Sequence, residues 1–391
     1  MAEIQIPEEY EGEEEIEILF DEDDNLVDPS LMDSDQQTEF NDNLAEFLDS
    51  STLSEISSKV LTNFQNDLDS REDWYETFKD GLELLGIQND PRSEPFEGAS
   101  GVYHPLLAEA VTHFQAQAYK ELLPANGPVD TKVMGASSDP KAMQANRVKD
   151  FMNYQLLYKM EEYDPEMDQM LFFLPLAGSA FKKCYFDPAI GRIVSRFIKA
   201  EDLVVPYSAT DLHTSPRITH RMSMTENDLL KLQLSGFYVD TDMNTPMYGG
   251  DNDSVQSKID EIDGVTRTGD QHDFTLLECH TELDIEGFEH TDSEGEPTGL
   301  ALPYIVTVCK DTNDVLAIRR NYVETDPMRK KVEYFTHFKF LPGLGFYGFG
   351  LIHMIGGVTK SATAILRQLI DAGTLANLPA GFKARGLNIQ R

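Results

Sequence analysis

The sequence predicts an α+β fold, in which helices and antiparallel strands occupy separate parts of the chain. Three observations support this prediction. Apolar residues recur at helical spacing through residues 59–179, β-rich runs separated by turn-forming residues follow through 180–341, and another long helical pattern begins at Leu351. With 391 residues and 40% hydrophobic content, the chain can bury a sizeable core in one large or two ordinary globular units.

The first 58 residues form an acidic segment. They contain twenty Asp or Glu residues and no Lys or Arg, so they carry more than half of the net charge of −37. A segment of this composition buries too little apolar surface to offset the entropy lost on ordering, so we expect residues 1–58 to be disordered. Such a tail would act as a solubilising segment or as an electrostatic contact for a basic partner.

Four helical regions are predicted between residues 59 and 179. The first is Lys59–Gly86, as one long helix or two separated by a break, with Gly86 as its stop. The second lies between two prolines in His104–Pro124. Its apolar face consists of Leu107, Ala110, Val111, Phe114 and Ala118. The third runs from Asp139, as N-cap, to about Met160, and the fourth from Pro165 to about Ser179.

Strand patterns dominate residues 180–341. The stretch Phe181–Ile198 contains two β-rich runs joined by a turn at 187–191, which predicts a hairpin. A short helix is expected at Thr225–Ser235, and the polar stretch Val239–Asp273 is expected to be a surface insertion. Four further β-rich runs predict an antiparallel meander, at Phe274–Ile285, Tyr304–Cys309, Val315–Tyr322 and Lys331–Leu341.

The C-terminal part predicts an aromatic and glycine-rich hinge at 342–350 and a helix over about Leu351–Leu378. On this helix, one apolar face is shared by Ala362, Ile365, Leu366, Leu369 and Ala376. The charge also changes sign here, because residues 351–391 contain five Lys or Arg and a single Asp.

The glycine-rich segment has one alternative interpretation. Its pattern Gly343-x-Gly345-x-x-Gly348 lies between a predicted strand and a helix, which is the context of a nucleotide-binding loop. However, the bulky residues Phe346 and Tyr347 would crowd a phosphate, and no βαβ unit surrounds the pattern. We therefore favour a flexible hinge that turns the chain from sheet into helix, and keep nucleotide binding as the alternative.

No other pattern predicts catalysis, a cofactor or a metal. The acidic run Asp240–Asp253 is similar to a calcium loop, but Thr245 replaces its required glycine. The neighbours Cys279 and His280 should point to opposite faces of a strand and so cannot share one metal. His104, His113, His213, His220 and His353 fit no ligand spacing or catalytic triad.

The remaining composition excludes several classes of protein. The three cysteines form no C-x-x-C pair and indicate neither a disulfide framework nor a zinc site, which fits a reducing compartment. The N-terminus has no secretion signal and no stretch is apolar enough to span a membrane, so we expect no membrane association. The acidic charge argues against a protein that grips nucleic acid through a basic face.

Four segments, in this order along the chain, resemble the portal proteins (head-to-tail connectors) of tailed double-stranded DNA bacteriophages. They read YHPLLAEAVTHFQAQAYKELLPANGPVDTKVMG from Tyr103, FFLPLAGSAFKKCYFDP from Phe172, AEDLVVPYSATDLHTSPRITHRMSMTENDLLKL from Ala200, and KFLPGLGFYGFGLIHMIGGVTKSATAILRQLIDAGTLANLPAGF from Lys339. The resemblance covers about residues 60–391 and depends on the order of these segments, since none of them is a catalytic signature.

The resemblance implies a portal-like architecture. Residues 59–350 would form a wing domain of helices and antiparallel sheet, 351–378 a stem helix and 379–391 the start of a clip. The five apolar residues of the last helix would pack against neighbouring subunits. The charged side chains that would face the channel or solvent are Lys360, Arg367, Lys383 and Arg385. Portal chains continue through a second stem helix, so we expect a truncated chain, the alternative being a reduced relative.

The resemblance also implies a structural role without enzymatic activity or cofactor. The subunit would assemble in the host cytoplasm into a homo-oligomeric ring, a dodecamer, at one capsid vertex of the virion. Double-stranded DNA would pass through the ring without sequence recognition. The partners implied are the large terminase subunit, the major capsid and scaffolding proteins, and head-tail adaptor proteins. Two alternatives remain, a non-viral adaptor with an acidic tail and a nucleotide-binding enzyme that uses Gly343–Gly350.

Overall fold

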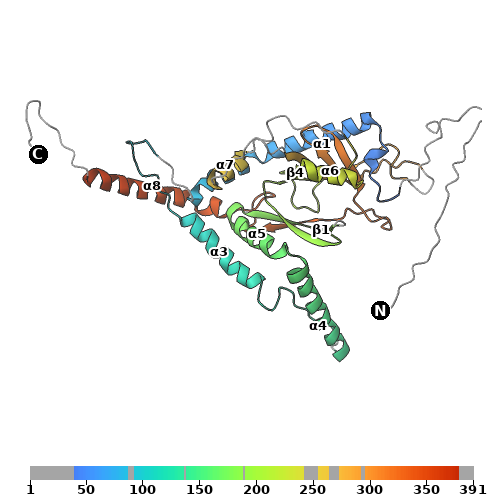
Figure 1. Cartoon of the computed structure of the whole chain (residues 1–391), viewed down its shortest axis with the longest axis horizontal. Helices are drawn as coiled ribbons and strands as arrows, with labels where there is room; N and C mark the ends of the chain where they lie inside the picture. The colour runs from blue at the N-terminus through green and yellow to red at the C-terminus, as the bar shows by residue number, and fades with distance from the viewer. Residues whose placement is uncertain are drawn as a thin grey trace, which may run out of the picture. The chain divides into compact units, whose positions relative to one another are not determined.

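The computed structural model of the chain describes residues 39–86, 92–135, 138–187, 190–241, 254–263, 273–291 and 296–377. The chain divides into two units, Met1–Asp42 and Asn43–Arg391, and the described helices and strands belong to the second. This second unit has an α+β fold, with helices and two antiparallel sheets, as the sequence predicts (Figure 1).

Helices α1 (Ser50–Ser70) and α2 (Glu72–Leu82) meet at Arg71, which confirms the break allowed within the first helical pattern. The side chain of Asp49 caps α1 by accepting hydrogen bonds from the amides of Ser51 and Thr52, at 2.9 and 3.2 Å. The short turn η3 (Glu83–Leu85) ends at Gly86, where a φ of 66° lies in the left-handed region that glycine adopts most easily. The predicted stop at Gly86 is therefore confirmed.

The next three predicted helices are also present, as α3 (Leu106–Leu122), α4 (Asp139–Tyr154) and α5 (Tyr163–Ala177). Ser138 rather than Asp139 occupies the N-cap position of α4. The chain leaves α4 through a π-helical turn, η4 (Gln155–Lys159). Helix α5 ends at Gly178, whose φ of 90° only glycine adopts readily.

The strands form two sheets, and every pairing within them is antiparallel. The first sheet has the order β2-β1-β8, with β1 (Ser179–Asp187), β2 (Arg192–Ile198) and β8 (Phe335–Lys339). The second has the order β3-β4-β5-β6-β7, with β3 (Leu203–Val204), β4 (Arg217–Thr225), β5 (Asp273–Leu283), β6 (Leu302–Cys309) and β7 (Val315–Arg320). The predicted hairpin is the pair β1-β2.

The predicted four-strand meander is wrong in its last member. Strands β5, β6 and β7 follow one another in the second sheet, but β8 pairs with β1, so that Ser179 lies opposite Lys339. Strands β3 and β4, which the sequence pattern did not reveal, complete the second sheet on its other side. A β-rich run shows that a strand forms, whereas its partner depends on which sheet edge is open after folding.

The region between the short helix α6 (Glu226–Leu234) and β5 is not only a surface insertion. Thr225 caps α6 as predicted, accepting a hydrogen bond from the amide of Asp228 at 3.2 Å. Within the insertion, residues 254–263 form α7 (Ser254–Asp263), and its Ile259 and Ile262 pack against the main core. The predicted surface insertion therefore contains a helix that packs on the core, which the sequence analysis did not predict. Residues 242–253 and 264–272 lie outside the described residues.

The helices cover the sheets with separate cores. Phe64 of α1 packs on Val204 and Leu277 of the second sheet. Helices α3 and α5 pack against the first sheet around Met170 and Leu171 (Figure 1). The largest core, called the main core, contains residues of α2, α3, α5 and the start of the last helix. Only the start of that helix is therefore packed into this core.

Ordered structure begins earlier than the predicted boundary at residue 58. The turn η2 (Leu44–Glu46) buries Leu44, and α1 starts at Ser50. The buried side chain of Asn43 donates to the carbonyl of Leu316 at 3.0 Å and accepts from the amide of Ile318 at 2.9 Å. The predicted disorder is corrected for residues 43–58, because these contacts tie the acidic stretch to β7; residues 1–38 lie outside the described residues.

Candidate interaction surface

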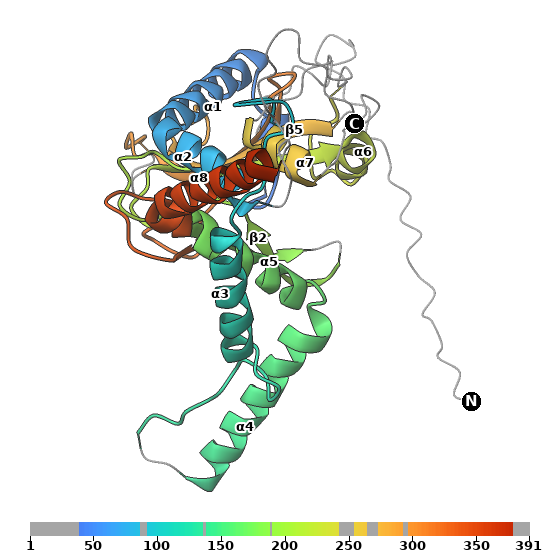
Figure 2. The same ribbon diagram turned by 90° about the vertical axis from the view of Figure 1, so that its left-hand side faces the viewer.

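The last helix, α8 (Leu351–Asn377), agrees with the prediction for residues 351–378, except that Leu378 is not described. At a rise of 1.5 Å per residue, its 27 residues span about 40 Å. Its first turn buries Ile352 in the main core, close against Gly81 of α2. The rest of α8 extends outward from the body of the second unit (Figures 1 and 2).

A packed corner at residues 342–350 sets the direction of α8. Phe346 and Tyr347 are buried in the main core. A Cβ on Gly348 would lie 2.3 Å from the carbonyl oxygen of Gly178, and one on Gly350 would lie 2.2 Å from that of Leu176. Glycine is needed here for close backbone contact rather than for mobility, so the segment is a fixed corner and not the flexible hinge that we predicted.

The buried side chain of Arg71 connects this corner to other parts of the chain through hydrogen bonds. Its Nη1 donates to the carbonyls of Ala200 and Leu203 and to the hydroxyl of Tyr347, at 2.9, 3.1 and 2.8 Å, while Nη2 donates to the carbonyl of Glu201 at 2.5 Å. One guanidinium thus connects the α1-α2 junction, the turn between β2 and β3, and the corner before α8.

One side of α8 is held by the segment that leads into α3. Arg367 Nε donates to the carbonyl of Val102 at 2.8 Å, and its guanidinium lies 4.3 Å from the ring centroid of Tyr103. Arg367 was predicted to face the channel or solvent; it is half-buried, and its guanidinium also contacts its own subunit. Lys360 is exposed, and Lys383 and Arg385 lie outside the described residues.

Two further hydrogen bonds complete the attachment on this side. The buried carboxylate of Asp371 accepts from the amide of Ser100 at 2.7 Å, and the hydroxyl of Thr363 accepts from the amide of His104 at 3.0 Å. Sequence reasoning missed these residues, since a polar residue on an apolar helix gives no sign of its partner far along the chain. With Arg367, they fix the rotation of α8 about its axis.

The five residues predicted to pack against neighbouring subunits are Ala362, Ile365, Leu366, Leu369 and Ala376. Ile365 and Leu369 keep 66% and 70% of their surface exposed, and Ala376 is exposed as well. Ala362 and Leu366 are half-buried. Three of the five predicted residues, Ile365, Leu369 and Ala376, are therefore open to a partner in the single chain.

Two residues that the sequence reasoning did not select belong to the same exposed side. Met354 and Val358 are 53% and 60% exposed and precede Ile365 at helical spacing. We call Met354, Val358, Ile365 and Leu369, with the alanines 362 and 376 beside them, the α8 face. Such a stripe of large apolar side chains on one exposed helix face is typical of a protein contact surface.

A second buried charge lies beside the corner. Glu201 is almost fully buried, and neither carboxylate oxygen accepts a hydrogen bond from the described residues; Lys199 Nζ is 3.9 Å away. Burial, followed by repulsion from Asp202, raises the pKa of Glu201 from 4.5 to about 7. The folded protein therefore favours the protonated carboxyl.

Replacing Glu201 with glutamine should raise the free energy of unfolding at pH 8, by an amount of up to about 3 kcal/mol. Below pH 4.5 the carboxyl is protonated in both states and costs nothing; the cost grows between pH 4.5 and about 7, where only the unfolded state ionises freely. Urea unfolding at pH 5 and pH 8 measures this cost, with Glu55→Gln, which changes an exposed carboxylate of α1, as the control. If Glu201→Gln raised the free energy of unfolding equally at both pH values, the raised pKa of Glu201 would be contradicted.

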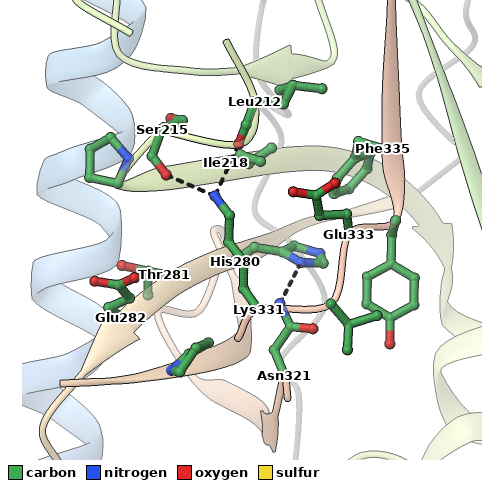
Figure 3. A pocket seen from close by; sticks show the side chains of 14 residues that line it. Leu212, Ser215, Ile218, His280, Thr281, Glu282, Asn321, Lys331, Glu333 and Phe335 are labelled. Carbon is green, nitrogen blue, oxygen red and sulfur yellow. Dashed lines mark hydrogen bonds between the residues drawn. The ribbon is translucent and has the colours of Figure 1, made fainter. Parts of the chain in front are cut away.

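A small cavity lies between the second sheet and the segment before β8 (Figure 3). Its volume of about 30 Å³ holds one water molecule, far below the several hundred Å³ of typical ligand sites. Lys331 donates to the carbonyls of Leu212 and Ser215 at 3.0 and 3.2 Å, and Asn321 lies 3.5 Å from a ring nitrogen of His280. The cavity is therefore too small for a substrate.

The geometry of the corner also bears on the nucleotide alternative. The amide of Gly348 donates to the hydroxyl of Ser179 at 2.8 Å, and that of Gly350 donates to His353 Nδ1 at 3.1 Å. The amide of Phe349 donates to the carbonyl of Leu341 at 3.0 Å. These three amides are thus used inside the protein, which argues against a phosphate bound at residues 348–350.

Across the described ranges, no group of three or more His, Cys, Asp or Glu side chains is placed to hold a metal ion. Of the run considered as a calcium loop, only residues 240 and 241 are described. Cys279 contacts Thr219 on one side of β5, whereas His280 contacts Glu278 on the other, as the strand geometry predicts.

The chain was also compared with known proteins. No protein-family model matches it, and no curated protein matches it either. Within the described part of the chain, none of the helices combines the length and apolar character needed to cross a bilayer. The α8 face is the candidate functional surface that its exposed apolar side chains support.

Proposed function

We propose that the chain is a portal subunit of a tailed bacteriophage, which assembles with its copies into a ring-shaped channel for viral DNA at one capsid vertex. The observation that carries the proposal is the α8 face, a row of exposed apolar side chains on a long helix whose other side is held by Arg367, Thr363 and Asp371. A helix fixed in this way presents its free side to a neighbour in one defined orientation. The order of the four family-like segments supports the same proposal.

The proposal assigns a mechanical and not a chemical role. The terminase motor would supply the energy for DNA movement, while the ring supplies a conduit and docking surfaces for the capsid, scaffolding and head-tail adaptor proteins. Each strong contact between a cation and a phosphate adds affinity that must be broken during movement. A subunit with a net charge of −37 is compatible with DNA that passes without being held.

Electron microscopy and mass photometry of the full-length protein test the proposal. We expect closed rings with a channel wide enough for duplex DNA. The double substitution Ile365→Asp/Leu369→Asp should abolish them without changing thermal unfolding of the subunit, because it places two charges in the contact. Ala364→Asp, at an exposed position off the α8 face, serves as the control and should leave rings intact.

A population of monomers at high concentration and in capsid extract would contradict the proposal. It would favour the alternative of an adaptor protein with an acidic tail. Rings that persist in the double variant would show that the α8 face is not the contact.

A further inference from the structure

Helix α4 and the turn η4 that continues it contain no buried residue. The main neighbour of α4 is η4. The loop before α4 contacts one side of it. There the side chain of Asn153 accepts a hydrogen bond from the amide of Val129 at 2.9 Å and donates one to its carbonyl at 3.0 Å. Figures 1 and 2 show α4 running outward from the sheets. A helix of 16 residues normally gains its stability from packing of an apolar face.

Four large side chains form a stripe along this helix and its π-helical end. Met143, Phe151, Tyr154 and Tyr158 recur at helical spacing, and Phe151 and Tyr158 are 60% and 73% exposed. The rings of Tyr154 and Tyr158 stack with centroids 5.9 Å apart. We call these four residues the α4 stripe. Aromatic residues and methionine in such an arrangement are typical of the centre of protein interfaces.

The α4 stripe adds apolar area to the α8 face, which by itself is smaller than a stable interface needs. The aromatic residues of the stripe expose on the order of 350 Å², and the four large residues of the α8 face roughly 300 Å². A stable interface buries about 800 Å² on each partner. The α8 face alone is therefore too small to hold a ring together, whereas both surfaces with their polar margins approach the required area.

The charge around the stripe matches the chain's own surface. Lys141, Arg147 and Lys159 are exposed on or beside α4, in a protein whose net charge is −37. Helix α2 carries an exposed row of carboxylates that includes Glu72, Glu76 and Asp80. Helices α2 and α4 lie apart within one chain (Figures 1 and 2). Helix α4 also carries the carboxylates of Asp139 and Asp150, but the exposed cations Lys141 and Arg147 on it, and Lys159 beside it, are opposite in charge to the acidic row of α2 on another copy.

From these observations we infer that the α4 stripe packs against a second copy of this chain, as a second contact zone between neighbours in the ring. The inference rests on the proposed ring and adds a surface that the sequence analysis did not single out. The aromatic side chains supply the apolar area, and the flanking cations orient the helix toward the acidic neighbour.

Photo-crosslinking in the full-length protein identifies what covers the stripe. p-Benzoylphenylalanine placed at Tyr158 should give covalent dimers of this chain after illumination of assembled rings. The same probe at Met152, which is exposed off the stripe, is the matched control and should give few. Rings without interchain crosslinks from position 158, or crosslinks only to another protein, would overturn the inference while leaving the proposed function standing. Absence of rings before illumination would overturn both.

A substitution gives an independent measurement. Phe151→Ser/Tyr158→Ser should raise the concentration at which rings dissociate at least about tenfold, since aromatic residues at interface centres dominate binding. Thermal unfolding of the subunit should be unchanged, because both side chains are exposed in the single chain. An unchanged dissociation concentration would mean that the stripe contributes nothing to the ring.

Discussion

Replacing Arg71 with methionine should lower the free energy of unfolding by about 3 kcal/mol, because each buried acceptor left without a donor costs about 1–3 kcal/mol. Arg71 is nearly inaccessible to solvent, and its guanidinium supplies the donors for three backbone carbonyls and the hydroxyl of Tyr347. Methionine fills the volume of the aliphatic stem but donates nothing. The hydroxyl of Tyr347 would still donate to the carbonyl of Leu203, at 3.2 Å, but the carbonyls of Ala200 and Glu201 would lose the donor that Arg71 supplies. Urea unfolding at pH 7 measures that loss.

The same substitution should also disturb α8, because Arg71 holds the corner from which this helix begins. Arg71→Lys should recover only part of the stability, since one ammonium cannot reproduce the planar fork that reaches separate carbonyls. Lys59→Met, at an exposed position of α1, is the control and should change the free energy of unfolding by less than about 0.5 kcal/mol. A loss below 1 kcal/mol for Arg71→Met would show that the network contributes little.

The second large effect is expected at the ion pair between the two sheets. Lys183 Nζ of β1 lies 2.6 and 2.7 Å from the two carboxylate oxygens of Glu278 of β5, and His280 Nε2 lies 2.8 Å from one of them. Burial alone would raise the pKa of Glu278, but Lys183, followed by His280, outweighs it and holds that pKa below its usual range. Lys183→Met should therefore cost about 3–5 kcal/mol at pH 7.

The pH dependence of this pair has a defined sign. Because the folded-state pKa of Glu278 is depressed, the pair stabilises the fold above the ordinary pKa of 4.5, and this contribution is lost as the pH falls below it. The difference between wild type and Lys183→Met should shrink accordingly toward pH 4. Unfolding curves at pH 7 and pH 4 measure the change.

A double variant separates the pair from a general packing defect. Lys183→Met/Glu278→Leu removes both charges and should recover most of the stability, because an apolar pair of similar volume is often as stable as a buried ion pair. Lys231→Met breaks the exposed contact with Asp228 and should cost at most about 0.5 kcal/mol. A double variant as unstable as Lys183→Met would show that packing, and not the unpaired carboxylate, sets the cost.

Part of the α8 face could be predicted from the sequence. Ile365 and Leu369 were selected from helical spacing alone, and both are exposed on α8. Spacing also marked Leu107 and Val111 of α3, which the structure buries. Periodicity shows that a helix has an apolar side, but it does not show whether that side meets its own chain or another. For the same reason, spacing gave no sign that Arg367 contacts Val102, which lies far away in sequence.

By itself the sequence determined the α+β class, the stop at Gly86, the β1-β2 hairpin and the long helix at Leu351, and it allowed a break within the first helical pattern without placing it. These features depend on neighbouring residues, whose spacing and backbone preferences act locally. Only the tertiary structure decided that β8 joins β1, that the glycine segment is a packed corner, and that α4 stands uncovered. Those outcomes depend on contacts between distant segments, because a strand edge, a carbonyl or an apolar face takes whichever partner the folded chain brings to it.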